Sequence, residues 1–203
     1  VLRASPPCRC GRVLCLRNGI LFTSLMDSRT FYDQYVERQV RVGVNARNRS
    51  ILNFLLRFGM KGDSRVLEIG SGVGTVTGLI ADTLTSQGSL VGVDLSPKSI
   101  AAAQEAVGRR ANVDLRAGDV LEMGFGSEFD VVVLPDVIEH IPLTLHKELF
   151  DKVGAWVKPS GFVLAHYPNP LWLAWCHDHR PDLLQSIDQP IHADLLTSHA
   201  YGA

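Results

Sequence analysis

The sequence predicts an α/β fold in which a doubly wound parallel sheet carries helices on both faces. Short apolar segments that have the character of strands alternate with helical segments along the chain. One of them, Phe129-Asp-Val-Val-Val-Leu-Pro135, is almost continuously apolar, as expected of a strand that is covered on both faces. Another leads directly into the glycine-rich turn Gly70-Ser-Gly-Val-Gly74. Together these features favour strand–helix–strand units in a single sheet.

Each element has its own local signal. Residues 51–58 repeat apolar side chains at helical spacing before Gly59, so they predict the first helix of the domain. Ser96 and Pro97 are a plausible N-cap and first residue of a later helix. The expected strands cover residues 64–70, 89–95, 113–117, 129–135 and 162–167. The other expected helices cover residues 75–84, 97–108 and 143–157, with a turn at 158–161 and a helix-like stretch at 194–199.

Composition limits the classes of function. The 203 residues are 46% hydrophobic and 20% charged with a formal net charge of -1, which suits one α/β domain. Nucleic acid and anionic membranes favour a clustered cationic face, so neither is expected as a partner. The longest apolar stretches are strand-sized, and no membrane span is expected. The prediction is a cytoplasmic protein of unknown oligomeric state.

The first 25 residues differ from the rest of the chain. They contain four arginines, three cysteines and no acid, and the chain begins with Val. We expect residues 1–25 to be a leader and residues 26–203 to be the domain. The spacing of Cys8, Cys10 and Cys15 lacks the paired units and the fourth ligand of a structural zinc site, which disfavours metal binding there.

Ligands of doubly wound sheets bind at the carboxyl ends of the strands. Polar residues or glycine occupy the end of every expected strand, at Gly70, Asp94, Asp119, Asp136 and His166. These positions are therefore the first candidates for a functional site.

The glycine turn indicates which ligand is bound. Gly70, Gly72 and Gly74 have no Cβ, so a ligand can approach the backbone, and the next helix presents its positive end. The dinucleotide pattern G-x-G-x-x-G is not met, because its sixth position is Thr75. Glu68 would repel a pyrophosphate but would attract an ammonium group. Asp94 is placed to bind ribose hydroxyls and Asp119 to bind an adenine amine, so the ligand that fits is S-adenosylmethionine.

Residues 66–141 resemble a class I S-adenosylmethionine-dependent methyltransferase of the small-molecule type, which has a Rossmann-like fold. The resemblance is carried by "VLEIGSGVG", "VGVDLSPKSI", "AGDV" and "FDVVVLPDVIEHI", in this order. It implies that the glycine turn holds the methionine part, that Asp94 holds the ribose and that Asp119 contacts the adenine. The implied cofactor-binding residues are Tyr35, Glu68, Gly70, Ser71, Gly72, Asp94, Leu95, Asp119, Val120 and Pro135.

The run after the fourth motif is expected to face the methyl acceptor. His140 is the side chain best suited to accept a proton near neutral pH, and Asp136 and Glu139 are the other catalytic candidates. The alternative is that His140 only pins the next helix. The run is also similar to the E-x-x-E-H of ubiquinone-biosynthesis O-methyltransferases, which is associated with a divalent metal. Metal binding is the less favoured alternative here, so no metal is predicted.

Two flanking segments are candidates for the walls of the acceptor pocket. Residues 31–35 lie where relatives have a lid helix, and Arg38, Arg41 and Arg47 follow, although a solvated basic face explains these arginines equally well. Trp172, Trp175 and His177 would line an apolar pocket or belong to the core. The family normally completes its sheet with two further strands, so the domain is expected to be C-terminally incomplete.

The sequence therefore predicts transfer of a methyl group to an oxygen or nitrogen of a small-molecule acceptor, by in-line displacement in a desolvated pocket. One alternative is a non-catalytic or truncated cofactor-binding domain. A less favoured one is an NAD-binding oxidoreductase domain, because Glu68 and Thr75 do not suit a dinucleotide.

Overall fold

The computed structural model describes residues 13–17, 20–24, 28–185 and 187–201. Two short strands, β1 (Val13–Arg17) and β2 (Ile20–Ser24), pair in an antiparallel sheet of their own. Cys8 and Cys10 of the predicted leader lie outside the described residues. The assignment of residues 1–25 as a leader stays a prediction.

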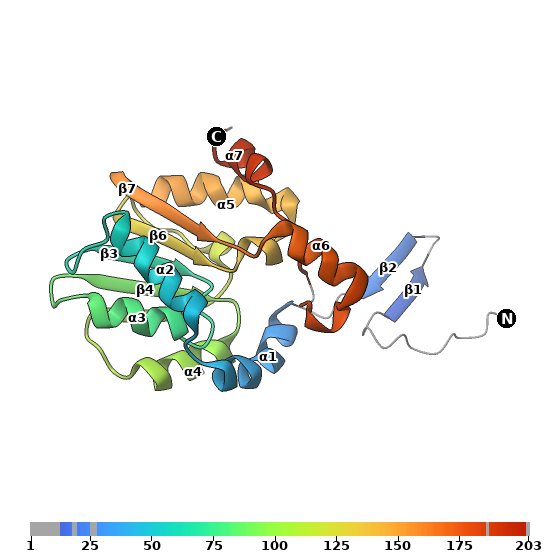
Figure 1. Ribbon diagram of the computed structural model, residues 1–203, viewed down its shortest axis with the longest axis horizontal. Coiled ribbons are helices and arrows are strands. Elements are labelled where there is room, and N and C mark those ends of the chain that lie inside the picture. The colour runs from blue at the N-terminus through green and yellow to red at the C-terminus, as the bar shows by residue number, and fades with distance from the viewer. Residues whose placement is uncertain (1–12, 18–19, 25–27, 186, 202–203) are drawn as a thin grey trace.

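The main sheet contains five strands, all paired in parallel, in the order β5-β4-β3-β6-β7 (Figure 1). The strands are β3 (Arg65–Ile69), β4 (Ser89–Asp94), β5 (Val113–Ala117), β6 (Phe129–Pro135) and β7 (Val157–His166). From β3 the chain adds β4 and β5 on one side, and then returns to add β6 and β7 on the other. The switch point between β3 and β6 is where such sheets bind ligands.

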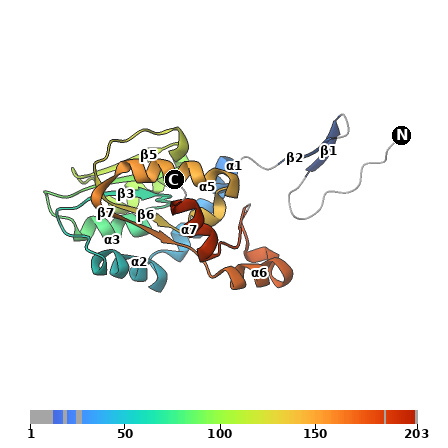
Figure 2. The same cartoon turned by 90° about the horizontal axis from the view of Figure 1, so that it is seen from above.

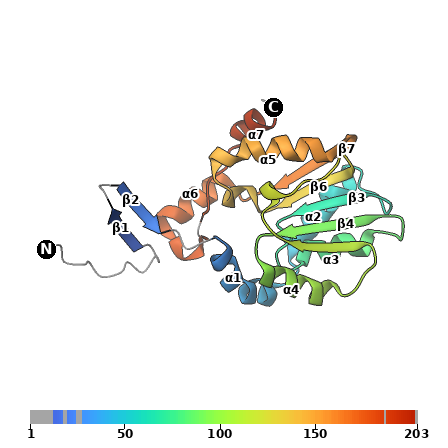
Figure 3. The ribbon, with the colours of Figure 1, turned by 180° about the vertical axis from the view of Figure 1, so that it is seen from behind.

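Helices cover both faces of this sheet, as Figures 1 and 3 show from opposite sides. On one face lie α2 (Ala46–Arg57), α3 (Thr75–Thr83) and α4 (Pro97–Val107). On the other lie α5 (Leu143–Trp156) and α7 (Ala193–Tyr201), in front of the sheet in Figure 2. The remaining helices are α1 (Ser28–Val42), α6 (Pro170–His179) and three short 3₁₀ helices, η1 (Val120–Glu122), η2 (Ile138–His140) and η3 (Pro181–Leu183).

The strands feed two separate cores because successive side chains point to opposite faces of a sheet. Val66 and Val131 are fully or almost fully buried with Ile51 of α2 and Ile80 of α3. Their neighbours Leu67 and Val132 belong instead to the core under α5, which includes Leu149, Val153 and Trp156. The central strands β3 and β6 are therefore buried on both faces along most of their length.

The helix starts follow from local sequence. Ser96 caps α4, since its hydroxyl accepts from the Ser99 N–H at 3.0 Å, and Pro97 is the first residue of the helix, as predicted. Asn45 caps α2 and forms a reciprocal pair with Asn48. α2 therefore begins several residues before the predicted residue 51.

The predicted turn at residues 158–161 is wrong. These residues lie within β7, where the strand is irregular: Val157 pairs with Phe129, and Phe162 is the next paired residue, opposite Val131. Turn-forming residues are here accommodated by a bulge, which lets the strand continue. The predicted doubly wound fold is confirmed. The further two strands expected from the family stay a prediction.

None of the helices in the described ranges combines the length and the apolar character that a membrane span needs.

Candidate functional site

A cavity of about 680 Å³ opens at the carboxyl ends of the strands, beside the switch point. Its walls come from α1, from the start of α2 and from the loops after β3, β4, β5 and β6. Every residue that the sequence predicted for the cofactor lines this cavity. The structure therefore brings them together, while their individual roles stay predictions.

The loop after β3 follows the floor of the cavity. Gly70 has φ of 79°, and a Cβ there would lie 2.2 Å from Cγ2 of Val137, which follows the neighbouring strand β6. The backbone N–H groups of Gly70 and Ser71 both donate to the carbonyl of Val93, at 2.7 and 3.0 Å. A side chain at Gly70 would thus meet both an unfavourable dihedral and a close neighbour.

Asp94 fastens this loop to the end of β4. One carboxylate oxygen accepts from the Gly72 N–H at 2.8 Å, and the other accepts from the Ser96 N–H at 2.9 Å. Burial raises the pKa of Asp94 above its ordinary range, and these two donors offset part of the rise. Asp94 therefore shapes the glycine loop in addition to lining the cavity.

Glu68 is completely buried at the base of the cavity. Neither of its carboxylate oxygens has a hydrogen-bond partner among the described residues. Burial raises its pKa to about 8; the nearby Thr77 hydroxyl, which does not reach hydrogen-bond geometry, opposes part of the rise, and the Asp94 carboxylate adds to it. A buried carboxyl without partners is costly, so its position in a cavity wall suits a ligand that supplies a hydrogen-bond donor.

Asp119 and Val120 follow β5 on the opposite wall. Asp119 caps η1, with one oxygen accepting from the Leu121 N–H at 2.9 Å. Val120 is buried. Leu95, which follows Asp94 after β4, also lines the cavity. This part of the wall is mainly apolar with one carboxylate.

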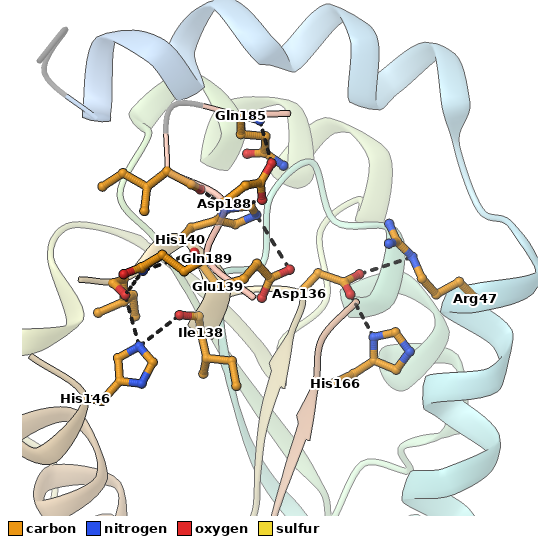
Figure 4. A network of polar contacts seen from close by, with 12 residues as sticks. Arg47, Asp136, Ile138, Glu139, His140, His146, His166, Gln185, Asp188 and Gln189 are labelled. Atoms are coloured by element: carbon orange, nitrogen blue, oxygen red, sulfur yellow. Dashed lines mark hydrogen bonds and ion pairs between the residues drawn. The ribbon is translucent and has the colours of Figure 1, made fainter. Parts of the chain in front are cut away.

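Asp136 lies between two basic side chains (Figure 4). One oxygen is 2.7 Å from Nδ1 of His166 at the end of β7, and the other is 3.2 Å from Nε of Arg47 in α2. Its φ of 55° is a left-handed conformation that aspartate tolerates better than most residues. Both oxygens of this predicted catalytic residue are therefore engaged in tying α2 and β7 to the end of β6.

Glu139, a predicted catalytic candidate, is 1% exposed and is not among the residues that line the cavity, so its role stays a prediction. Burial raises its pKa to about 7, an effect that the adjacent His140 partly opposes. Glu139 lies in η2, and Figure 4 shows its carboxylate directed toward His140.

His140 does line the cavity, and both ring nitrogens have neighbours. Nδ1 lies 2.6 Å from the carbonyl oxygen of Ile187 and 3.1 Å from a carboxylate oxygen of Asp188. Nε2 lies 3.7 Å from Oε1 of Glu139. Burial lowers the pKa of His140, but Asp188, Glu139 and the Ile187 carbonyl together outweigh it, so that the pKa is raised.

The alternative of a metal site finds no support in this geometry. Asp136 is directed toward Arg47 and His166, whereas His140 lies between Glu139 and Asp188 (Figure 4). Within the described ranges, no group of three or more His, Cys, Asp or Glu side chains is arranged to hold a metal ion.

Several wall residues were not predicted from the sequence. Tyr32 lies in the expected lid segment, and its ring contacts that of His140 edge-on at 6.2 Å between centroids. Gln185 and Ile187 arrive from the segment after α6 and also line the cavity. Tyr32 lies three residues before Tyr35, so helical spacing could have placed both side chains on the same wall of the cavity. No feature of the local sequence indicates that Gln185 and Ile187 also belong to the wall.

The tryptophans of α6 lie elsewhere. Trp172 and Trp175 are both 48% exposed, and Trp175 stacks on His179. Neither lines the cavity, and neither is buried in the core. His177 instead contacts the backbone of the site, since its Nε2 is 2.6 Å from the Asp188 carbonyl oxygen. Both readings of Trp172 and Trp175 offered by the sequence are therefore wrong.

Comparison with known proteins now adds to the geometry. The family described as "Methyltransferase domain" matches residues 66–161, the span from β3 into β7. This match over 96 of the 203 residues agrees with the class I methyltransferase resemblance predicted from the sequence. The doubly wound fold and the likeness to methyltransferases agree with the predictions from sequence.

Among curated proteins, the chain is similar to the ubiquinone biosynthesis O-methyltransferase of Nitrobacter winogradskyi, with 33% identity over 53% of the chain and 40% of that protein. It is also similar to the phosphoethanolamine N-methyltransferase of Plasmodium falciparum, with 31% identity over 50% of the chain and 38% of that protein. The chain thus spans about 40% of the length of these relatives.

Solved structures show the same fold. One is the phosphoethanolamine N-methyltransferase 2 of Haemonchus contortus in complex with phosphomonomethylethanolamine and S-adenosylhomocysteine, with TM-score 0.60 and 27% identity. That likeness covers 76% of this chain and 36% of that one. A methyltransferase in complex with the Trm112 activator of Haloferax volcanii has TM-score 0.69 over 85% of this chain and 75% of that one, and at 17% identity it supports the fold alone.

Proposed function

We propose that this protein binds S-adenosylmethionine in the cavity and transfers its methyl group to an oxygen or nitrogen of a small-molecule acceptor. The observation that carries the proposal is Glu68, a buried carboxyl without a partner at the base of a glycine-lined cavity. The ammonium group of an aminoacyl ligand would satisfy it, whereas a pyrophosphate would not.

The residues present fit the cofactor along the whole cavity. Gly72 leaves room beside the backbone, since a Cβ there would first meet the Gln39 side chain, at 3.5 Å. The N-cap of α3 is Gly74, which offers no side-chain cap. The first N–H groups and the positive end of α3 are therefore available to a carboxylate. Asp94 would hold the ribose hydroxyls, and Leu95, Asp119 and Val120 would surround the adenine. The bound cofactor supplies a methyl group on a sulfonium, which is open to in-line attack.

The acceptor would occupy the part of the cavity beside His140. Tyr32, His140, Gln185 and Ile187 line this part, and these elements close the cavity from opposite sides. His140 would accept a proton from an acceptor hydroxyl or amine as the new bond forms. Enclosure by α1, Gln185 and Ile187 would exclude water, which provides much of the advantage in a displacement reaction.

Calorimetry with S-adenosylhomocysteine and with NAD tests the cofactor assignment. We expect binding of the first and none of the second, and Asp94→Ala should raise the dissociation constant at least about tenfold because it loses a charged hydrogen-bond acceptor. Asp82→Ala is the matched control, since Asp82 is exposed and pairs with Arg110 outside the cavity. No binding of S-adenosylhomocysteine, or an unchanged constant in Asp94→Ala, would refute the assignment.

A separate assay addresses turnover. Acceptors of the kinds named for the relatives, a ubiquinone precursor and phosphoethanolamine, are the first to be offered together with labelled S-adenosylmethionine. Binding of the cofactor with no transfer to any acceptor would favour the second candidate, a non-catalytic cofactor-binding domain. A cytoplasmic location and the absence of a nucleic-acid partner remain predictions from composition.

A further inference from the structure

His140 is held by the segment that follows α6, far away in the sequence. The carbonyl oxygen of Ile187 is 2.6 Å from Nδ1, and Oδ1 of Asp188 is 3.1 Å from the same nitrogen. The side chains of His140 and Asp188 are 11% and 7% exposed. Figure 4 shows Asp188 directly beside His140, with Glu139 on the opposite side of the ring. The contact is therefore a buried one, with little competition from water.

This segment is itself fixed in place. The second oxygen of Asp188 accepts from the Gln185 N–H at 2.6 Å, and the Asp188 carbonyl oxygen lies 2.6 Å from Nε2 of His177. Gln189 donates from its backbone N–H to the Glu139 carbonyl at 3.0 Å, and from its side chain to the Ile141 carbonyl at 2.7 Å. Contacts of the residues before and after Asp188 therefore hold it against η2.

The chemistry of the two partners fixes the protonation pattern of the ring. A carbonyl oxygen and a carboxylate can only accept, so Nδ1 must carry the proton in this contact. A neutral imidazole has one proton, which leaves the lone pair on Nε2. The same arrangement, with a carboxylate at Nδ1 and a reactive Nε2, orients the histidine of hydrolytic triads.

We propose that Asp188 is a positioning residue that, with the Ile187 carbonyl, holds His140 as the Nδ1–H tautomer and stabilises the imidazolium formed during methyl transfer. The kinetic part rests on the proposed function. In that step Nε2 takes the proton of the acceptor O–H or N–H, and the acceptor's electron pair forms the bond to the methyl carbon. The carbon–sulfur pair stays on sulfur, and the positive charge on the imidazolium faces Asp188.

Three side chains on different elements face His140: Asp188 after α6, Glu139 in η2 and Tyr32 in α1. The two carboxyl groups favour the imidazolium, and the pKa of His140 is raised accordingly despite burial. A base acts in its neutral form, so activity should rise with pH through this raised pKa. Removing the charge of Asp188 should lower the pKa and move the rise in activity to lower pH.

Nitrogen NMR of the ligand-free, ¹⁵N-labelled protein tests the assignment without turnover. His140 resonances are identified by their loss in His140→Asn. We expect the Nδ1–H tautomer in the wild type and a lower imidazole pKa in Asp188→Asn, which keeps an acceptor oxygen but removes the charge. Asp182→Asn is the matched control, because Asp182 is exposed, pairs with Arg180 and should leave the pKa unchanged. An Nε2–H tautomer, or an unchanged pKa in Asp188→Asn, would overturn the proposal.

The kinetic measurement separates this proposal from the proposed function. Asp188→Asn should lower kcat at least about tenfold with little change in KM for S-adenosylmethionine, and shift the pH profile to lower pH. If the wild type transfers no methyl group but NMR gives the expected tautomer and pKa change, the proposed function fails and the pairing of His140 with Asp188 stands. An active Asp188→Asn with a wild-type pH profile contradicts the kinetic role.

Discussion

Gly70 lies where the loops after two neighbouring strands approach each other closely. β3 and β6 are neighbours, so the loop after β3 lies against Val137 after β6. The absence of a side chain at Gly70 is therefore required by packing as well as by its positive φ. The packing requirement comes from Val137, which lies 67 positions further along the chain.

Gly70→Ala should destabilise the protein by about 1–3 kcal/mol, because the methyl group combines a strained dihedral with a clash against Val137. Gly78→Ala is the control: it lies within α3, where an added Cβ meets no atom of the described residues within 4 Å. Gly78→Ala should instead stabilise the protein by about 0.5–1 kcal/mol, because alanine has the higher helix propensity. Urea denaturation measures both; equal effects from the two substitutions would contradict the packing argument.

Glu68 makes stability depend on pH. Its pKa in the folded protein, about 8, lies above its ordinary value of 4.5, so its contribution is most favourable below pH 4.5 and is lost as pH rises toward 8. Glu68→Gln should therefore be more stable than the wild type at pH 8, by about 1.4 kcal/mol for each pKa unit of the shift, and lose this advantage toward pH 5.

Denaturation of the ligand-free protein between pH 5 and pH 8 measures this difference. Glu105→Gln, an exposed substitution on α4, should give a curve parallel to the wild type. The same Glu68→Gln variant should bind S-adenosylhomocysteine more weakly, because the amide lacks the charge that attracts an ammonium group. A pH-independent difference between Glu68→Gln and wild type would show that Glu68 has no raised pKa.

At the scale of elements, α1 forms part of the cavity wall, and a short hydrogen bond joins it to the start of α4. Asp33 accepts a hydrogen bond from the Ser96 hydroxyl at 2.5 Å, which ties α1 to the start of α4. The same hydroxyl accepts from the Ser99 N–H, so the cap of α4 and the anchor of α1 share one atom. Tyr32, Tyr35 and Gln39 of α1 line the cavity and depend on this position.

Asp33→Ala should loosen α1 by about 1–3 kcal/mol, the usual range for a hydrogen bond to a charged group. Hydrogen exchange of the α1 amides should accelerate, and S-adenosylhomocysteine should slow it again by holding the helix in place. Glu37→Ala removes a similar side chain from an exposed position of the same helix and should change neither quantity. Unchanged exchange in Asp33→Ala would show that α1 is anchored by other contacts.

The whole molecule explains why one site collects residues from distant parts of the chain. The carboxyl ends of four parallel strands converge at the switch point, and the segments before β3 and after α6 close over them. Cavity-lining residues therefore range from Tyr32 to Ile187. The two apolar cores, under α2 and under α5, lie on the two faces of the sheet. They hold the sheet in place, and the sheet positions the loops that form the cavity.

The sequence alone predicted the strand–helix order, the strand ends and the glycine turn, because local propensity and apolar periodicity act over a few residues. Gly70, Asp94 and Asp119 could be found in this way, since a strand end is a local feature. The turn expected at residues 158–161 is instead an irregular part of β7, held between the pairs that Val157 and Phe162 form with β6. Strand pairing is a contact between distant segments, and a local pattern does not contain it.

Only the tertiary structure decided what each residue of the Asp136 to His140 run does. Asp136 binds Arg47 and His166, Glu139 is buried outside the cavity, and His140 is held by Ile187 and Asp188. Their partners come from α2, β7 and the segment after α6, so no spacing within the run could specify them. The sequence determined which ligand the strand ends suit, because those residue types carry the chemistry. Folding determined which side chains face it, because burial and pairing are set by neighbours far away in the chain.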